Sequence, residues 1–190
     1  MQSEARSPRT TGALVLVGLM ALSLFINYID RGNLATGATQ IRADLNLSAT
    51  AYGALAAAFY FAYAFFQLPA GALSDRIGGK LVLGLGALLW SLSTLLTGFV
   101  EGFMGLFVLR LMLGMGESVA FTTTSKIIAT NVPRAQMGLA NGVIGFGYLV
   151  GPAVGTLLGG FMMAQWGWRA TFFAFGAVSL LWLIPWSRVR

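Results

Sequence analysis

The stretch "TGALVLVGLMALSLFINYIDRGNL", residues 11–34, decides the fold class. From Thr11 to Ile29 it carries no charge, and its length is close to the roughly 20 apolar residues that a helix needs to cross a bilayer. Asp30 and Arg31 follow at once, at a depth where charge is costly and therefore rare. The run is too long for a signal peptide and lacks a small-residue cleavage site, so we expect a retained membrane helix.

The composition of the chain indicates an integral membrane protein. Of 190 residues, 57% are hydrophobic and 9% are charged, whereas a soluble domain carries about 25% charged residues. Without cysteine or histidine, the sequence excludes disulfides, metal sites built from these residues and a histidine base. No phosphate loop or nucleophile with a base is present, so we expect no enzyme activity. The basic residues are scattered singly, which argues against nucleic-acid binding.

Six apolar segments predict an all-α fold with six transmembrane helices. They cover roughly residues 13–38, 50–72, 81–100, 104–127, 137–163 and 168–187. Residues 1–12 then form an N-terminal tail, 13–187 the six-helix bundle, and 188–190 the start of a loop.

The distribution of lysine and arginine predicts the orientation in the membrane. One side holds Arg6, Arg9, Arg76, Lys80, Arg134, Arg188 and Arg190, and the other holds Arg42 and Arg169. Because cytoplasmic loops carry the excess of basic residues, we expect both termini in the cytoplasm.

Charged residues within the expected spans indicate a polar path. Asp30 and Arg110 are expected at similar heights and are able to pair, which lowers the cost of burying both. Arg110, Gly114 and Glu117 share one helix face, and Gly114 leaves room beside it. Burial favours the neutral form of a carboxylate, so Asp30 and Glu117 are candidate proton carriers. The alternative is a static ion-pair network that fixes helix packing.

A second group of residues is predicted to bind substrate. Arg31, Arg110 and Lys126 would make a cavity attractive to anions, although Arg31 and Lys126 are also able to snorkel to the membrane surface. Hydrogen-bonding side chains on the first two helices are further candidates, with helix packing or lipid contact as the alternative. These are Asn27, Tyr28, Tyr60, Tyr63 and Gln67.

Three motifs resemble those of the major facilitator superfamily. "GALSDRIGGK", residues 71–80, resembles its G-x-L-x-D-R-x-G-R/K-R/K loop, although Leu81 replaces the last basic residue. "RLMLGMGE", residues 110–117, and "GYLVGPAVGTLLG", residues 147–159, resemble its helix-four and helix-five motifs. Glycines at 147, 151, 155 and 159 form a stripe for tight packing, and Pro152 bends that helix. The residues assigned to conformational gating are Gly71, Asp75, Arg76, Gly78, Lys80, Gly151, Pro152 and Gly155.

Within this superfamily, "NYIDRGNL", "ADLNLS" and "MLGMGES" are similar to the anion–cation symporter family of sugar-acid, hexuronate, aromatic-acid and sialin-like transporters. The resemblance implies proton-coupled symport of a small organic anion by alternating access, with the proton as coupling ion and no other cofactor. It implies that Asp30 and Glu117 take up protons, that Arg110 pairs with Asp30, and that Arg31 and Tyr63 contact the substrate. The helix-five motif keeps open a proton antiporter that exports drugs or lipids, and spinster-like lipid transporters share a similar first-helix motif.

The superfamily is built from two six-helix halves, each an inverted 3+3 repeat. The resemblance therefore implies that this chain is the N-terminal half, in a bacterial inner or plasma membrane, with the C-terminal half absent. Its expected partners are the lipid bilayer and that missing half or a second copy of itself. Asp75 would normally meet a helix of the second half. A truncated, non-transporting fragment is the remaining alternative.

Overall fold

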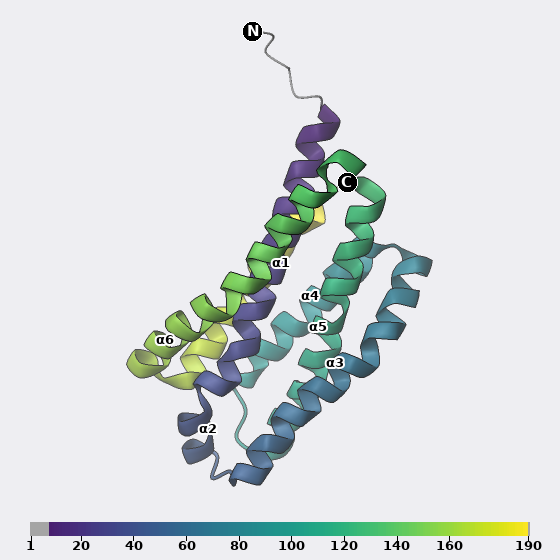
Figure 1. The fold of residues 1–190 in the computed structure, drawn as a ribbon. Coiled ribbons are helices and arrows are strands. Elements are labelled where there is room, and N and C mark those ends of the chain that lie inside the picture. The colour runs from purple at the N-terminus through teal and green to yellow at the C-terminus, as the bar shows by residue number, and fades with distance from the viewer. Residues whose placement is uncertain (1–7, 190) are drawn as a thin grey trace.

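The computed structural model describes residues 8–189, and the all-α expectation is confirmed for them (Figure 1). The helices are α1 (Pro8–Thr36), α2 (Ala38–Asp44), α3 (Ala49–Ile77), α4 (Gly79–Thr97), α5 (Phe103–Asn131) and α6 (Met137–Arg188), with a 3₁₀ turn at Arg134–Gln136. Within this part of the chain, five helices are long and apolar enough to cross a membrane, namely α1, α3, α4, α5 and α6.

Helix α6 reverses direction at Gly167. Its 52 residues would extend about 78 Å if straight, more than twice the roughly 30 Å of a bilayer core. Gly167 has φ 78° and ψ 167°, a conformation open to glycine because it lacks a Cβ. Figure 1 shows the green part of α6 running beside α1 and the yellow-green part returning. The segments predicted at 137–163 and 168–187 thus lie in one helix broken at Gly167.

Several predicted boundaries differ from the structure. Helix α1 starts at Pro8, inside the predicted tail, and α2 occupies part of the predicted loop after residue 38. Helix α3 continues to Ile77 rather than 72, and α5 to Asn131 rather than 127. Polar residues extend these helices beyond their apolar runs, because backbone hydrogen bonds continue wherever the chain permits. Helix α3 ends only at Gly78, whose φ of 92° is not helical. Arg6 and Arg190, two of the basic residues from which the orientation was predicted, lie outside the described residues, as does the side chain of Arg9.

The glycine stripe of α6 packs directly against α1. A Cβ atom built on Gly147 would lie 2.7 Å from the Ala21 carbonyl oxygen, and one on Gly155 would lie 2.8 Å from the Ile29 Cα. Gly159 continues the contact, since its Cβ would lie 3.1 Å from the Asn33 side chain. The absence of side chains therefore lets the two backbones approach closely, as the sequence pattern predicts.

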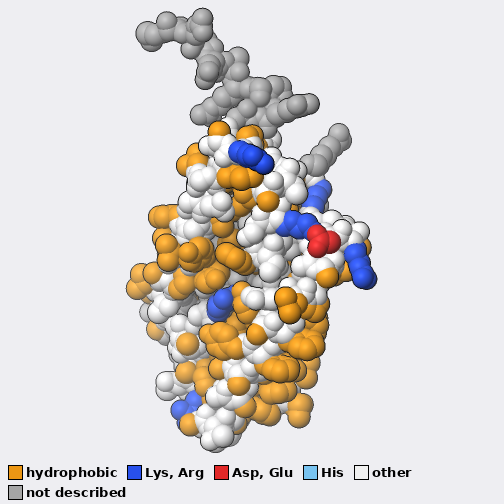
Figure 2. All heavy atoms as spheres, turned by 45° about the vertical axis from the view of Figure 1, so that its right-hand side comes forward, with side chains coloured by type: hydrophobic (Ala, Val, Ile, Leu, Met, Phe, Trp, Pro, Cys, Tyr) orange, Lys and Arg blue, Asp and Glu red, His pale blue; other side chains and the backbone are white. Residues whose placement is uncertain are grey.

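The two ends of the bundle differ in charge. The start of α1 and the end of α6 lie at the same end in Figure 1. On the face drawn in Figure 2, most lysine and arginine side chains gather near this end, above a largely hydrophobic surface. Among the described side chains, the cations of that end are Arg76, Lys80, Lys126, Arg134 and Arg188, against Arg42 and Arg169 at the other.

Candidate functional site

The centre of the candidate site is a buried ion pair between α1 and α5. Glu117 has no exposed side-chain surface, and its Oε2 accepts hydrogen bonds from Arg31 Nε at 3.1 Å and Nη2 at 2.9 Å. Arg31 Nη2 also donates to Asn27 Oδ1, at 3.3 Å. Three residues singled out in the sequence thus meet at one point, and the snorkelling alternative for Arg31 is wrong in this structure.

Aromatic rings surround the Arg31 guanidinium group. Its carbon lies 4.4 Å from the ring centre of Tyr28 and 4.6 Å from that of Tyr63. Phe59 adds a third ring, at 5.5 Å. Such cation–π contacts hold the cation by its faces, while its hydrogen-bonding edge contacts Glu117 and Asn27. Phe59 was missed in the sequence because it carries no polar group, although it lies four residues before Tyr63 on the same helix face.

Asp30 and Arg110, the pair expected from the sequence, do not form an ion pair in the described chain. Asp30 is buried and faces α6, where its Oδ2 accepts a hydrogen bond from Ser179 Oγ at 3.0 Å. Arg110 is also buried, and its Nε and Nη2 have no partner among the described residues. The prediction was wrong because similar height along two helices does not fix the direction of their side chains. Ser179 gave no signal, since it is one uncharged residue within an apolar run.

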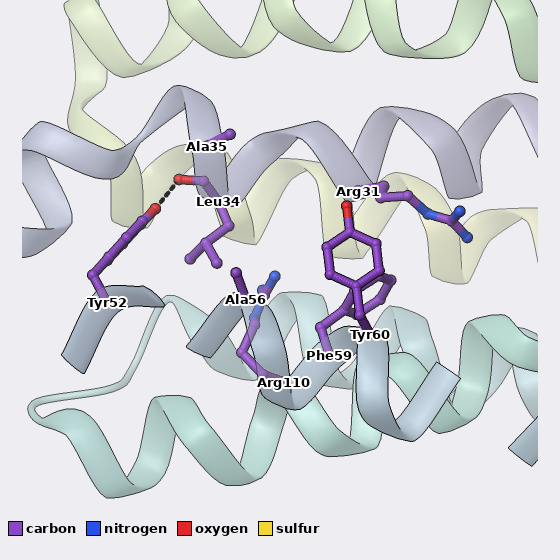
Figure 3. A pocket seen from close by; sticks show the side chains of 8 residues that line it. All are labelled: Arg31, Leu34, Ala35, Tyr52, Ala56, Phe59, Tyr60 and Arg110. Atoms are coloured by element: carbon purple, nitrogen blue, oxygen red, sulfur yellow. Dashed lines mark hydrogen bonds between the residues drawn. The ribbon is translucent and has the colours of Figure 1, made fainter. Parts of the chain in front are cut away.

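A small pocket lies between α1, α3 and α5, next to both arginines (Figure 3). Its volume is about 110 Å³, enough for a few water molecules and below the roughly 300 Å³ at which metabolite pockets begin. In Figure 3 the Arg31 side chain extends along α1 away from Arg110, and the Tyr52 hydroxyl donates to the Leu34 carbonyl oxygen. The lining residues are Arg31, Leu34, Ala35, Tyr52, Ala56, Phe59, Tyr60 and Arg110.

Three residues predicted for the site lie elsewhere or act differently. Lys126 pairs with Asp75, because it follows Glu117 by more than two helical turns and reaches the end of the bundle. Gln67 makes no hydrogen bond within residues 8–189. Gly114 leaves no room, since a Cβ there would lie 2.4 Å from the Phe59 carbonyl oxygen, so it serves close packing of α5 on α3.

The first motif, whose residues were assigned to conformational gating, spans the turn between α3 and α4. Gly78 turns the chain with a positive φ of 92°. Asp75 was expected to meet a helix of the second half, and within the described chain it pairs with Lys126 of α5. No cluster of three or more metal-ligating side chains occurs among the residues that the structure describes.

Comparisons with known proteins give a matching family model and similar transporters. A family model described as Major Facilitator Superfamily matches residues 20–190. The chain is 36% identical over 170 residues to a probable sulfoacetate transporter of Cupriavidus necator, covering 90% of this chain and 40% of the relative. It is 32% identical over 175 residues to the hexuronate transporter of Bacillus subtilis, covering 92% and 42%.

A solved structure also matches the fold. It is a bacterial homologue of the human lysosomal transporter Spinster in an inward-facing, unoccupied conformation, with a TM-score of 0.86 and 24% identity. The match covers 97% of this chain and 44% of that protein. The chain spans about two fifths of the length of the curated relatives given above.

Proposed function

The chain belongs to the Major Facilitator Superfamily, and from this premise we propose that it forms part of a secondary active transporter for a small organic anion, coupled to protons. Two relatives, named for the transport of sulfoacetate and of hexuronate, support an organic anion as the substrate. Substrates of this class carry a carboxylate or sulfonate group that a guanidinium recognises through paired hydrogen bonds.

The Arg31–Glu117 ion pair is the observation that carries the proposal. Glu117 occupies the hydrogen-bonding edge of Arg31 with 3.1 and 2.9 Å contacts. When Glu117 takes up a proton, its attraction for Arg31 falls, and this edge becomes available to a substrate anion. The substrate and the charged Glu117 therefore compete for one cation, which couples anion binding to proton uptake. Asp30 precedes Arg31 on α1 but is buried against α6, and it forms no ion pair within residues 8–189, so it is proposed as a second proton carrier.

The proposed topology has six spans, because α6 would cross the membrane once on each side of Gly167. The first three and the last three spans would form the inverted repeat of the superfamily. The cationic end of the bundle would face the cytoplasm, in a bacterial inner membrane. A second six-helix half, or a second copy, would complete the substrate path.

Glu117→Gln tests the coupling in the whole protein that carries this chain. The variant is expected to lose proton-driven net uptake of the anion while retaining exchange of labelled for unlabelled substrate, because glutamine cannot release a proton. Glu101→Gln, on an exposed carboxylate outside the helices, is the matched control and should leave both activities unchanged. Normal net uptake by Glu117→Gln would refute the coupling role.

A proton antiporter is the second candidate, and the glycine stripe of α6 with Pro152 favours it through its resemblance to the helix-five motif. An imposed pH gradient separates the two functions. With the outside acidic, a symporter accumulates the anion in right-side-out vesicles, whereas an antiporter expels its substrate.

A further inference from the structure

Two adjoining hollows lie at the cationic end of the bundle, away from the arginine pocket. One is an apolar groove of about 440 Å³ between α4 and the end of α6. The other, the polar hollow, is the more polar of the two. It has a volume of about 510 Å³ and is bounded by the ends of α3, α5 and α6, the start of α4, and Leu16 of α1. Lys80 and Trp186 line both. The arginine pocket is lined by α1, α3 and α5, so the groove draws on helices that this pocket does not use.

The groove has a fixed floor and apolar walls. Trp186 is 3% exposed and donates its indole N–H to the Lys80 carbonyl oxygen at 3.1 Å, which ties the end of α6 to the start of α4. Gly84 opens the space above it, because a Cβ there would lie 3.3 Å from the indole nitrogen. The walls are formed by Leu81, Leu85, Leu88 and Leu183. The three α4 leucines extend over about 10 Å, roughly two thirds of the hydrocarbon depth of one leaflet.

The polar hollow carries a net positive charge. Asp75 and Lys126 neutralise each other as an ion pair. Lys80 forms no ion pair with any described residue and is exposed to the hollow. Ser74 is 2% exposed, and its Oγ lacks a hydrogen-bond partner within residues 8–189. Lys80 and Ser74 line the same hollow, and an unpaired cation together with an unsatisfied hydroxyl matches the oxygens of an anionic phosphate group.

We propose that the two hollows together bind one anionic phospholipid, with its phosphate at Lys80 and one acyl chain along the groove of α4 and α6. A cationic hollow that continues into an apolar groove matches an amphipathic anion. A fully soluble anion would leave the groove unfilled. A tryptophan at the junction suits the boundary between headgroups and hydrocarbon. If this end faces the cytoplasm, as the excess of basic residues indicates, it meets the leaflet that is rich in anionic lipids.

Native mass spectrometry of the whole protein in detergent, titrated with phosphatidylglycerol or phosphatidylethanolamine, tests the site. Phosphatidylglycerol should be retained more strongly. Lys80→Gln should weaken its retention about fivefold, the effect of one basic residue near an anionic lipid. Arg76→Gln is the matched control, since Arg76 is an exposed cation at the same end but outside both hollows, and should change retention little. Leu183→Trp should reduce retention by filling the groove without altering charge.

Three results would overturn the proposal. Equal retention of the two lipids would show that charge does not select the ligand. Equal losses for Lys80→Gln and Arg76→Gln would assign the effect to the general positive charge of this end. Displacement of phosphatidylglycerol by soluble glycerol phosphate at the same concentration would identify a site for soluble anions. Because lipid retention is measured without transport, failure here is distinguishable from failure of the transport function.

Discussion

Two arginine–carboxylate pairs in this molecule have the same closest distance and opposite surroundings. Arg31 and Glu117 approach to 2.9 Å inside the bundle, with 19% and 0% of their side chains exposed. Arg169 and Asp44 also approach to 2.9 Å, but at the end opposite the termini, with 38% and 48% exposed. Because the distance is equal, any difference in energy or role between the pairs must come from burial and from their other partners.

The outer pair belongs to a set of contacts that fixes the reversal of α6. Arg169 Nη1 donates to the Val100 carbonyl oxygen at 2.7 Å, and Trp168 Nε1 donates to Asp44 at 3.2 Å. These bonds link α2, the connection after α4 and the segment directly after Gly167. Water remains available to replace them, so loss of the charge attraction costs little. The inner pair has no such replacement, and loss of one partner leaves a buried charge alone.

The largest expected effect is that of Arg31→Gln on stability. Glu117 would lose its cation in a site without exposed surface, so we expect the free energy of unfolding to fall by about 3–5 kcal/mol. Adding Glu117→Gln should recover most of this loss, because no lone charge then remains. Chemical unfolding in mixed micelles, applied to the two single variants and the double variant, measures the coupling.

Additive losses from Arg31→Gln and Glu117→Gln would contradict the distinction between the buried and the exposed ion pair. They would show that the inner pair behaves as two independent residues despite its burial. A loss that the double variant does not recover would assign the cost to the packing of Arg31 against its aromatic rings.

The sequence was sufficient to predict the helical class, the family resemblance and the close packing of the α6 glycines, because length, hydropathy and small-residue spacing are properties of single segments. It did not predict that α1 is the helix against which these glycines pack. The pairing of charges was harder to predict. Asp30 and Arg31 are neighbours, and the sequence favoured Asp30 as the partner of α5. In the structure, Arg31 pairs with Glu117 of α5, whereas Asp30 accepts a hydrogen bond from Ser179 of α6.

Such choices depend on the rotation of each helix about its axis, which the packing of the whole bundle sets. For Lys126, too, the direction of the side chain could not be predicted from the sequence. Its place within an apolar stretch indicated the anion cavity, yet its side chain reaches Asp75 at the end of the bundle. Phe59 and Ser179 were missed because neither carries a charge, and only their neighbours in space give them a role.

An intermediate effect is expected for Ser179→Ala, which removes the hydrogen bond to Asp30. At an alkaline pH that ionises Asp30, this bond is made to a charged group and contributes about 1.5–3 kcal/mol, so we expect a loss of that size in the free energy of unfolding under these conditions. Ser93→Ala is the matched control, because Ser93 is equally buried but donates to the Leu89 carbonyl of its own helix. Unfolding in mixed micelles should show a smaller loss for the control.

Repeating Ser179→Ala in an Asp30→Asn background sharpens this result. The loss should shrink to about 0.5–1.5 kcal/mol, the range for a bond between neutral groups. An unchanged loss would mean that Ser179 stabilises the fold through packing rather than through its hydrogen bond to a charged Asp30. Asp30 would then differ from Glu117 and Asp44, which both act through their charge.

The smallest effect is expected for Asp44→Asn in the outer pair. Asparagine keeps an oxygen that accepts from Trp168 and removes only the charge facing Arg169, so the free energy of unfolding should fall by about 0–1 kcal/mol. In 1 M salt, where charges are screened beyond about 3 Å, this difference should vanish, whereas the loss in Arg31→Gln should persist because its site excludes salt. Glu101→Gln, at an exposed carboxylate without an ion pair in the described chain, gives the baseline. A loss for Asp44→Asn as large as that for Arg31→Gln, and insensitive to salt, would show that equal distance rather than burial decides the strength of both pairs.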